Sequence, residues 1–245
     1  MTPEEFSERF EVLYNNLLSN AAPGLDEHDK SVLLTKAQLE IVKNYFSNKG
    51  NKYGEGFDDS AKRQQDFSTL ISTVILPQVS GDTQFDGRSV SYSLPKDLLF
   101  VIGEVLQVNS DVRQVIPVSF DEYARLMSKP YKRPLKNQAW RLVTQYSNSS
   151  SVAEIVTTLE DASKNMVYKM RYVRMPRPII VGNLHDINES LYIDGEYEPS
   201  SGSLPESMHE EILQRAVELA KASYASDQSG QAQLQNQITV GQRSE

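Results

Sequence analysis

The stretch Met166-Val167-Tyr168-Lys169-Met170-Arg171-Tyr172-Val173-Arg174 places bulky apolar side chains at every second position. Tyr168, Met170 and Tyr172 share one parity, and Lys169 and Arg171 share the other. Because successive side chains of a strand point to opposite faces of a sheet, this pattern predicts a strand with one face on a core and one face in water.

Segments on both sides of this stretch have the same character, with turn residues such as Asn109-Ser110-Asp111 between them. We expect strands over residues 70–79, 89–94, 98–108, 112–118, 139–146, 153–159, 166–173 and 177–181. The order of residues 139–146, 153–159 and 166–173 predicts an antiparallel meander. Ser119 and Glu122 form a capping box, which predicts a short helix ending near Met127.

Helices are expected at the N-terminal end. Thr2, Pro3 and Glu5 combine an N-cap, a proline at the first helical position and the partner of a capping box. An apolar stripe of helical period follows, ending before Asn20; it contains Phe6, Phe10, Leu13 and Leu17. A second helix is expected over residues 26–46, so that the two can form a helical hairpin.

A further helix is expected from Leu204 to about Tyr224, with an apolar stripe rich in alanine. The stripe contains Met208, Ile212, Leu213, Ala216, Val217, Ala220 and Tyr224. Small side chains allow a second helix to approach closely, either within the fold or from a neighbouring subunit. The residues from Asp227 onward are polar, and we expect them to become ordered only against a partner.

The fold class expected from these segments is α+β, with an N-terminal helical hairpin, a mostly antiparallel β core, and a C-terminal amphipathic helix with a polar extended tail. The expected parts are the helical hairpin (1–48), a flexible loop and short helix (49–69), the β-rich core (70–182), an acidic loop (183–203), the C-terminal helix (204–226) and the polar tail (227–245).

Composition excludes several classes of protein. The chain has 245 residues, a formal net charge of -8 and no cysteine, so disulfide scaffolds, zinc–thiolate sites and cysteine nucleophiles are excluded. No apolar run approaches the roughly 20 residues of a membrane span, and the acidic start does not read as a signal peptide. An intracellular product is therefore expected.

No catalytic motif is present in the sequence. His28, His185 and His209 fall in different expected elements, and both the phosphate-binding loop and the G-x-S-x-G motif are missing. We therefore expect no enzyme activity and no catalytic, cofactor-binding or metal-binding residues. An enzyme with an unrecognised site is the least supported alternative.

Charge is segregated along the chain. Residues 124–152 contain no acidic side chain but six basic ones, Arg125, Lys129, Lys132, Arg133, Lys136 and Arg141. Residues 183–215 contain eight acidic side chains against Arg215 alone. The acidic ones are Asp186, Glu189, Asp194, Glu196, Glu198, Glu206, Glu210 and Glu211.

This segregation has three interpretations: pairing between copies or with a charged partner, pairing of the two segments within one chain, and nucleic-acid binding assisted by Tyr131 and Trp140. A sequence pI near 5.1 disfavours the last. The candidate residues for a subunit or partner interface are the six basic residues together with Met208, Ile212, Ala216 and Ala220.

Several phrases of the sequence resemble the neck proteins of crAss-like tailed bacteriophages. The resemblance lies in Asn15-Asn16, in residues 22–25 and 29–40, in residues 172–181 with Arg177-Pro178-Ile179-Ile180, and in residues 204–217. It implies a virion structural protein of the head-to-tail connector, assembled in the host bacterial cytoplasm, in which rings of identical subunits are stacked below the portal.

The implied partners are further copies of the chain, twelve by this resemblance, the portal protein, adjacent neck or tail proteins, and double-stranded DNA passing through the lumen without sequence-specific binding. No membrane is implied. We expect part of the negative charge to line the lumen and the basic segment to lie at subunit interfaces. The alternatives are another phage tail or cargo structural protein, and a small nucleic-acid-binding accessory protein.

Overall fold

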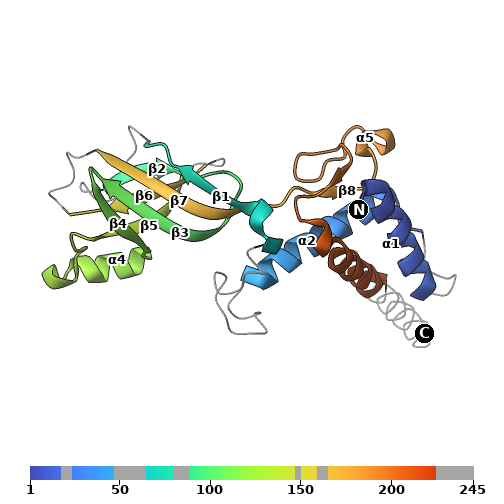
Figure 1. Ribbon diagram of the computed structural model, residues 1–245, viewed down its shortest axis with the longest axis horizontal. Coiled ribbons are helices and arrows are strands. Elements are labelled where there is room, and N and C mark those ends of the chain that lie inside the picture. Colours follow the sequence, from blue (N-terminus) through green and yellow to red (C-terminus); the bar gives the residue numbers. More distant parts are fainter. Residues whose placement is uncertain (18–23, 47–64, 80–88, 147–149, 159–164, 225–245) are drawn as a thin grey trace, which may run out of the picture. The chain divides into compact units, whose positions relative to one another are not determined.

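The computed structural model describes residues 1–17, 24–46, 65–79, 89–146, 150–158 and 165–224. The chain divides into two compact units, which are described separately (Figure 1). The helical unit comprises residues 1–69 and 176–245, and the sheet unit comprises residues 70–175. The α+β fold class is confirmed. The tail expected at residues 227–245 lies outside the described residues.

The sheet unit contains seven strands in the order β1-β7-β3-β4-β5-β6-β2. Their bounds are β1 Ile71–Ile75, β2 Ser89–Ser93, β3 Leu98–Val108, β4 Asp111–Pro117, β5 Gln138–Tyr146, β6 Ser150–Val156 and β7 Met166–Arg174. All neighbours are antiparallel except β4 and β5, which are parallel. The segment after β1 bridges to β2 through Gln78 and Tyr92, so the two ends of the sheet meet.

The expected meander of the last three strands is wrong in its last step. β5 and β6 are antiparallel neighbours, but β7 lies between β1 and β3 and does not pair with β6. Strand β6 uses its second edge for β2 instead, with Val90 opposite Ile155. Pairing is therefore set by strands distant in the sequence.

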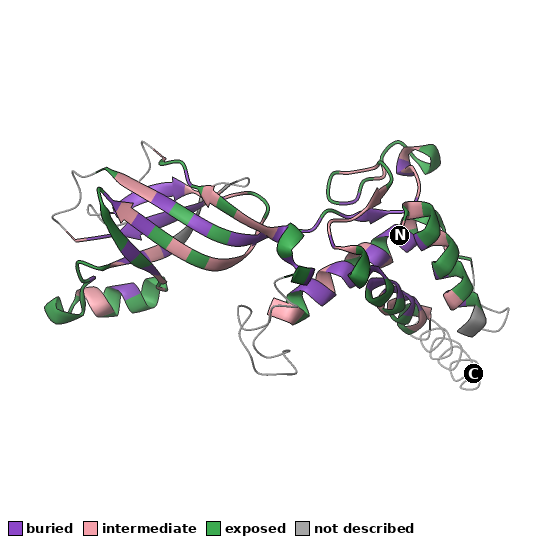
Figure 2. Cartoon of the chain, in the orientation of Figure 1, coloured by how far each residue is buried: buried purple, intermediate pink, exposed green. Residues whose placement is uncertain are grey.

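The alternation of β7 predicted its burial correctly. Tyr168, Met170 and Tyr172 are buried in the core of the sheet unit, while Lys169 and Arg171 are exposed (Figure 2). The rings of Tyr168 and Tyr92 meet edge to face, with centroids 5.2 Å apart. Such pairs add about 1 kcal/mol to the free energy gained by burial alone.

Helix α4 (Phe120–Met127) covers a second, smaller apolar cluster of the sheet unit. Its N-cap is Ser119, whose hydroxyl accepts a hydrogen bond from the Glu122 N–H at 3.3 Å, as the capping pattern predicted. Tyr123 packs edge to face against Trp140, with ring centroids 6.3 Å apart. The short helix η3 (Pro130–Lys132) follows and leads into β5.

In its described residues, the helical unit contains three longer helices and a small hairpin. Its elements are α1 Pro3–Leu17, α2 Glu27–Phe46, β8 Ile179–Ile180, α5 Leu184–Ile187, β9 Ser200–Ser201, η5 Glu206–Met208 and a C-terminal helix over residues 209–224. The short helix η2 (Ser68–Leu70) lies at the boundary to the sheet unit. The capping box of α1 is confirmed, because the Thr2 N–H donates to the Glu5 carboxylate at 3.1 Å and the Glu5 N–H to the Thr2 hydroxyl at 3.2 Å.

Strand β8 lies against α2, which places residues 176–182 in the helical unit, although the sequence grouped them with the β core. The Thr35 hydroxyl accepts from the Ile179 N–H at 3.1 Å, and the Ser31 hydroxyl accepts from the Val181 N–H at 3.1 Å. The Gln38 amide donates to the Arg177 carbonyl at 2.7 Å. Polar side chains of α2 thus satisfy the backbone groups of this short strand. Of the helices in the described part of the chain, none is both long and apolar enough to cross a membrane.

Candidate functional site

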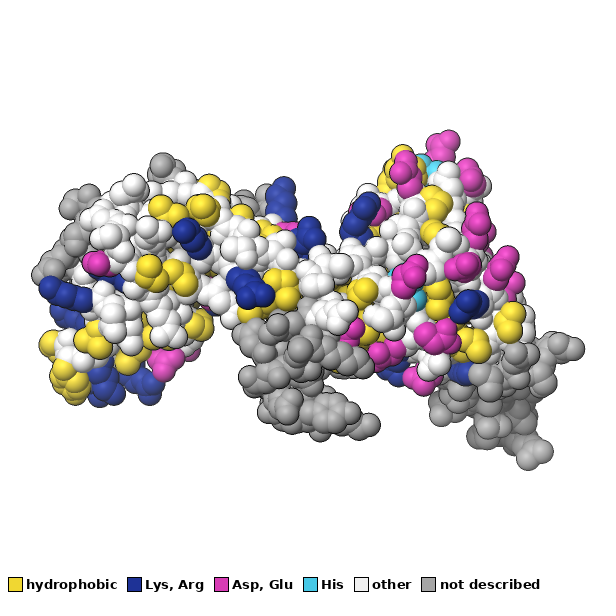
Figure 3. All heavy atoms as spheres, viewed as in Figure 1, with side chains coloured by type: hydrophobic (Ala, Val, Ile, Leu, Met, Phe, Trp, Pro, Cys, Tyr) yellow, Lys and Arg dark blue, Asp and Glu magenta, His cyan; other side chains and the backbone are white. Residues whose placement is uncertain are grey.

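Five of the six predicted basic residues gather on one surface of the sheet unit. This basic surface comprises Arg125 on α4, Lys129 and Lys132 at η3, and Arg133 and Lys136 before β5, all of them exposed. Figure 3 shows dark blue side chains gathered at the end of the sheet unit where α4 lies. Arg125 lies 3.4 Å from Glu122, but both side chains are in water, so this pair adds little stability.

Apolar side chains accompany these charges. Tyr131 is 78% exposed and Leu135 is 59% exposed, and Phe120 at the start of α4 is 38% exposed. A surface that combines cations with exposed aromatic and aliphatic groups is typical of a protein docking site, because the apolar groups gain from burial and the charges provide orientation.

Arg141 does not belong to the basic surface. Its Nε atom lies 3.0 Å from the Glu104 carboxylate, and the two side chains are 11% and 6% exposed. The N–H of Arg141 Nε does not point at that oxygen, so the contact is an ion pair without a well-directed hydrogen bond. The Tyr168 hydroxyl donates to the same carboxylate at 2.5 Å.

Sequence reasoning missed this buried cluster of Glu104, Arg141 and Tyr168. Burial raises the pKa of Glu104, while the hydrogen bond from Tyr168 and the charge of Arg141 oppose that rise. Burial and the adjacent Glu104 raise the pKa of Tyr168. The one available signal was Glu104 itself, which is the single charged residue of the apolar stretch 98–108.

The predicted stripe of the C-terminal helix packs inside the helical unit. Met208, Ile212, Ala216 and Ala220 are each no more than 4% exposed in the single chain. Beside them, the ring of His209 lies 5.0 Å from that of Phe6 on α1. The stripe therefore lies in the core of the helical unit.

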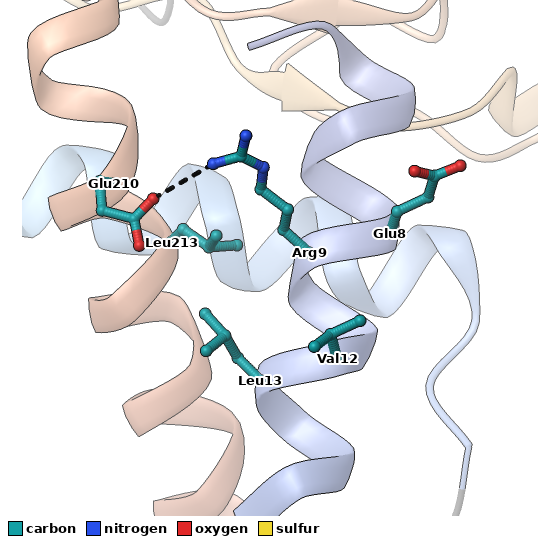
Figure 4. A pocket seen from close by; sticks show the side chains of 6 residues that line it. All are labelled: Glu8, Arg9, Val12, Leu13, Glu210 and Leu213. Atoms are coloured by element: carbon teal, nitrogen blue, oxygen red, sulfur yellow. Dashed lines mark ion pairs between the residues drawn. The ribbon is translucent and has the colours of Figure 1, made fainter.

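An open hollow of about 360 Å³ lies between α1 and the C-terminal helix. Figure 4 shows Leu13 and Leu213 pointing toward each other across it, and Arg9 reaching from α1 toward Glu210. Arg9 and Glu210 are 3.6 Å apart and both are half exposed, so this ion pair bridges the hollow without closing it. Val12 on its rim is 58% exposed.

The acidic loop, residues 183–203, presents exposed carboxylates on the helical unit. Glu189, Asp194 and Glu198 are exposed there. Glu196 differs, because its carboxylate accepts hydrogen bonds from Nε and Nη2 of Arg177, each at 3.1 Å, and these bonds raise the pKa of Arg177. This bidentate pair fixes the loop beside β8, whereas the three exposed carboxylates and that of Asp186 remain on the surface.

The two units differ in the sign of their charge. Among the described residues, the helical unit has eighteen Asp and Glu against seven Lys and Arg, whereas the sheet unit has six against eleven. The segregation read along the sequence therefore coincides with the division of the fold.

One group of side chains could in principle approach a metal ion. Asp26, His28 and Asp29 at the start of α2 place their ligand atoms within 4.8 Å of one another. Asp26 already accepts from the Asp29 N–H at 2.7 Å as a helix cap, and acidic groups are favourable at a helix N-terminus without any metal. Local helix capping accounts for this cluster.

Known phage proteins resemble this chain over most of its length. The family model of the crAss phage tail ring proteins, described as phage tail ring protein 3/4, matches residues 1–232. Ring protein 4/5 of Bacteroides phage crAss001 is 51% identical over 247 residues, covering the whole of both chains. Ring protein 3 of the same phage is 30% identical over 229 residues, covering 90% of this chain and 95% of that protein. The resemblance to crAss-like phage proteins is confirmed, and the chain belongs to the phage tail ring protein 3/4 family.

Proposed function

We propose that this chain is a non-enzymatic virion subunit that forms a ring in the connector between the head and the tail of a crAss-like phage. Membership of a ring protein family supports the ring. The observation that carries the assembly mode is the opposite charge of the two units, which is unlike a self-complementary surface. Two different surfaces that meet head to tail generate a closed ring when the rotation permits.

The interface that we propose joins the basic surface of one copy to the acidic loop of the next. The basic surface contributes Lys132 and Arg133 around the exposed Tyr131, and the loop contributes Glu189 and Glu198. Apolar burial at Tyr131 and Leu135 would supply affinity, and the charges would supply register and the rate of encounter.

The remaining negative charge suits a wall around DNA. Glu4, Glu5 and Glu8 are exposed on α1 and add to the acidic character of the helical unit. Carboxylates facing a lumen would repel phosphate, so that double-stranded DNA could slide without being held. The ring would stand below the portal, next to other neck or tail proteins, in twelve copies, after assembly in the host cytoplasm.

Solution mass tests this proposal. Light scattering after gel filtration would be measured on the chain alone and then on the chain mixed with the portal protein of the same phage. We expect a ring, or a large complex of defined mass that requires the portal. A chain that stays monomeric in both samples would contradict the connector role.

Nucleic-acid binding is a second candidate, favoured by the exposed Tyr131 among five cations. A titration with double-stranded DNA at increasing salt separates the two. For a nucleic-acid-binding protein, the logarithm of the binding constant would fall linearly with the logarithm of the salt concentration. The slope would correspond to several phosphate contacts. The connector proposal expects no binding at physiological salt.

A further inference from the structure

The sheet unit has an open seam between β3 and β4. These strands pair only over Val105–Val108 and Asp111–Gln114. Residues 98–104 of β3 continue along β7, and residues 115–117 of β4 continue along β5. On the edges that face each other across the seam, residues 101–104 of β3 and 115–117 of β4 pair with no further strand within the described part of the chain.

A hollow of about 700 Å³ follows this seam. It is lined from β3 by residues 101–105, from β4 by Gln114, Val115 and Pro117, and from β5 by Arg141. On the other side of β3, residues 169–171 of β7 and Thr73 of β1 complete the lining. Two register irregularities in the pairing of β3 with β7 lie in the same stretch, between Leu98 and Phe100 and between Val101 and Gly103. Bulges bend a strand, so they account for the separation of β3 from β4.

Gly103 gives a second indication that a backbone approaches here. A Cβ atom on Gly103 would meet nothing within 4 Å, so the packing of the chain itself does not require a glycine. A glycine in the interior of a strand commonly marks a bulge or a place where another backbone comes close. The first condition applies at Gly103, which lies at a register irregularity of β3, and the open space beside it leaves room for the second.

The sequence supplies a segment that fits. Residues Gln231-Ala232-Gln233-Leu234-Gln235-Asn236-Gln237-Ile238-Thr239-Val240 alternate, with glutamine or threonine at every odd position. The even positions are apolar except for Asn236. This period of two is that of a strand with one apolar and one polar face, and it lies in the tail that follows the C-terminal helix.

We propose that residues 231–240 of a neighbouring copy add as a strand to β3 at the seam, which links successive subunits of the ring. The proposal rests on the proposed function, because it requires copies side by side. Unpaired backbone groups of an edge strand are a template for strand addition, in which main-chain hydrogen bonds supply affinity and alternate side chains supply register.

Length and polarity agree with this occupant. The four edge residues 101–104 of β3 extend about 13 Å and ten tail residues about 33 Å, at about 3.3 Å per residue, so the alternating segment is long enough to cover the edge. Its apolar face would turn toward Val101, Val115 and Met170. Asn236 is the one polar residue of that face, and it would meet the buried ion pair of Glu104 and Arg141. The exposed cations Lys169 and Arg171 also line the hollow.

The absence of cysteine allows a direct test. Full-length Gly103→Cys and full-length Gln235→Cys would be mixed and oxidised with oxidised glutathione, and disulfide-linked dimers would be measured on a non-reducing gel. We expect dimers from Gln233→Cys, Gln235→Cys or Gln237→Cys at least fivefold above those from Leu234→Cys or Asn236→Cys. No dimers, or equal yields from odd and even positions, would overturn the proposal.

A single chain carrying both Gly103→Cys and Gln235→Cys tests which copy provides the strand. A neighbouring copy gives linked dimers and higher multiples. A monomer with an internal disulfide, formed independently of concentration, would mean that the tail returns to its own chain, and the proposal would be wrong.

A matched charge pair tests the apolar face. Leu234→Asp with Ile238→Asp should lower the yield of Gly103 cross-links at least tenfold when combined with Gln235→Cys. Gln233→Asp with Gln237→Asp adds the same charge to the opposite face and should retain most of the yield. Equal losses in both variants would contradict a strand with the predicted parity.

The proposed ring assembly and the proposed strand addition can be tested separately. Light scattering of the same samples that shows a ring without cross-links would reject the strand and leave the proposed function standing. If the chain is monomeric, a synthetic peptide of residues 229–242 with cysteine at position 235 replaces the second copy. Labelling of Gly103→Cys by this peptide, but not by one of shuffled sequence, supports the seam, and equal or absent labelling overturns it.

Discussion

Substitution of Glu104 should lower the free energy of unfolding more than substitution of any residue of the exposed basic surface. Its carboxylate is buried with the Arg141 guanidinium and the Tyr168 hydroxyl, so each group compensates the loss of water around the others. Removal of one partner of such a pair leaves a buried charge uncompensated. The pairs on the surface, such as Arg125 with Glu122, have no comparable cost because water replaces the partner.

Glu104→Gln should therefore destabilise the protein by about 3 kcal/mol, the magnitude usual for breaking a buried pair. The measurement is the free energy of unfolding in urea at neutral pH. Glu122→Gln makes the same substitution in the exposed pair with Arg125, and should change stability by less than about 0.5 kcal/mol. Equal effects of the two substitutions would show that Glu104 is not held as a buried pair.

His209 predicts a dependence of stability on pH. Burial lowers the pKa of His209 below its ordinary value of 6.5, the carbonyl of Leu204 opposes that change, and the nearby amino group of Met1 adds to it. The unfolded chain therefore binds a proton at higher pH than the folded chain does. The neutral ring of His209 therefore contributes fully to the stability of the folded chain above pH 6.5. This contribution is lost as the pH falls from 6.5 through the lower pKa of the folded state.

His209→Gln should flatten this dependence, since glutamine does not titrate and its amide can still donate to the Leu204 carbonyl. The measurement compares urea midpoints above and below pH 6.5 for both proteins. We expect the difference between the two pH values to be smaller in the variant. An unchanged difference would mean that other groups control the acid response.

Among the elements, the β9 hairpin depends on one glycine. Gly202 has a φ of 80°, and a Cβ atom there would lie 2.4 Å from the Gln38 Oε1 and 2.8 Å from a side-chain carbon of Ile179. Gln38 cannot simply move away, because its amide nitrogen binds the Arg177 carbonyl. Gly195 has a similar φ of 85°, but a Cβ atom there would meet nothing within 4 Å.

The two glycines form a matched pair for mutation. Gly195→Ala should cost about 1 kcal/mol, the strain of a left-handed backbone with a side chain. Gly202→Ala should cost about 1 to 3 kcal/mol more, because overpacking against α2 is added to that strain. Thermal unfolding of both variants measures the difference, and equal costs would show that α2 adjusts without penalty.

The elements themselves followed from local patterns of the sequence. The alternation in residues 166–174 and the caps at Thr2 and Ser119 are local signals, and the structure confirms each of them. Strand neighbours were not predictable in the same way, because the place of β7 between β1 and β3 depends on residues far away in the chain.

The candidate site shows the same division. A run of cations without acids predicted the exposed basic surface, since isolated charges remain in water. It could not separate Arg141 from the others, because the partner Glu104 comes from another strand, 37 residues earlier in the chain. Likewise, β8 joined the helical unit through hydrogen bonds from Ser31, Thr35 and Gln38.

At the scale of the whole molecule, the opposite charges of the basic surface and the acidic loop would attract each other in the head-to-tail contact that we propose. A head-to-tail contact uses both surfaces of every subunit, so damage to either one should prevent ring closure. Lys132→Glu with Arg133→Glu reverses the basic surface, and Glu189→Lys with Glu198→Lys reverses the acidic loop. Each pair of changes alone would place like charges opposite each other.

The decisive comparison combines the two reversals in one chain. Each reversal alone should weaken assembly at least tenfold, about 1.4 kcal/mol per contact. The variant with all four substitutions should recover much of the lost assembly, because opposite charges again face each other. Lys36→Glu with Lys43→Glu makes the same charge change on α2 and should assemble normally. Light scattering measures assembly, with the portal present where the unaltered chain requires it. If each reversal alone impairs assembly and the variant with all four substitutions does not recover it, the two surfaces bind different partners and are not joined to each other in the ring.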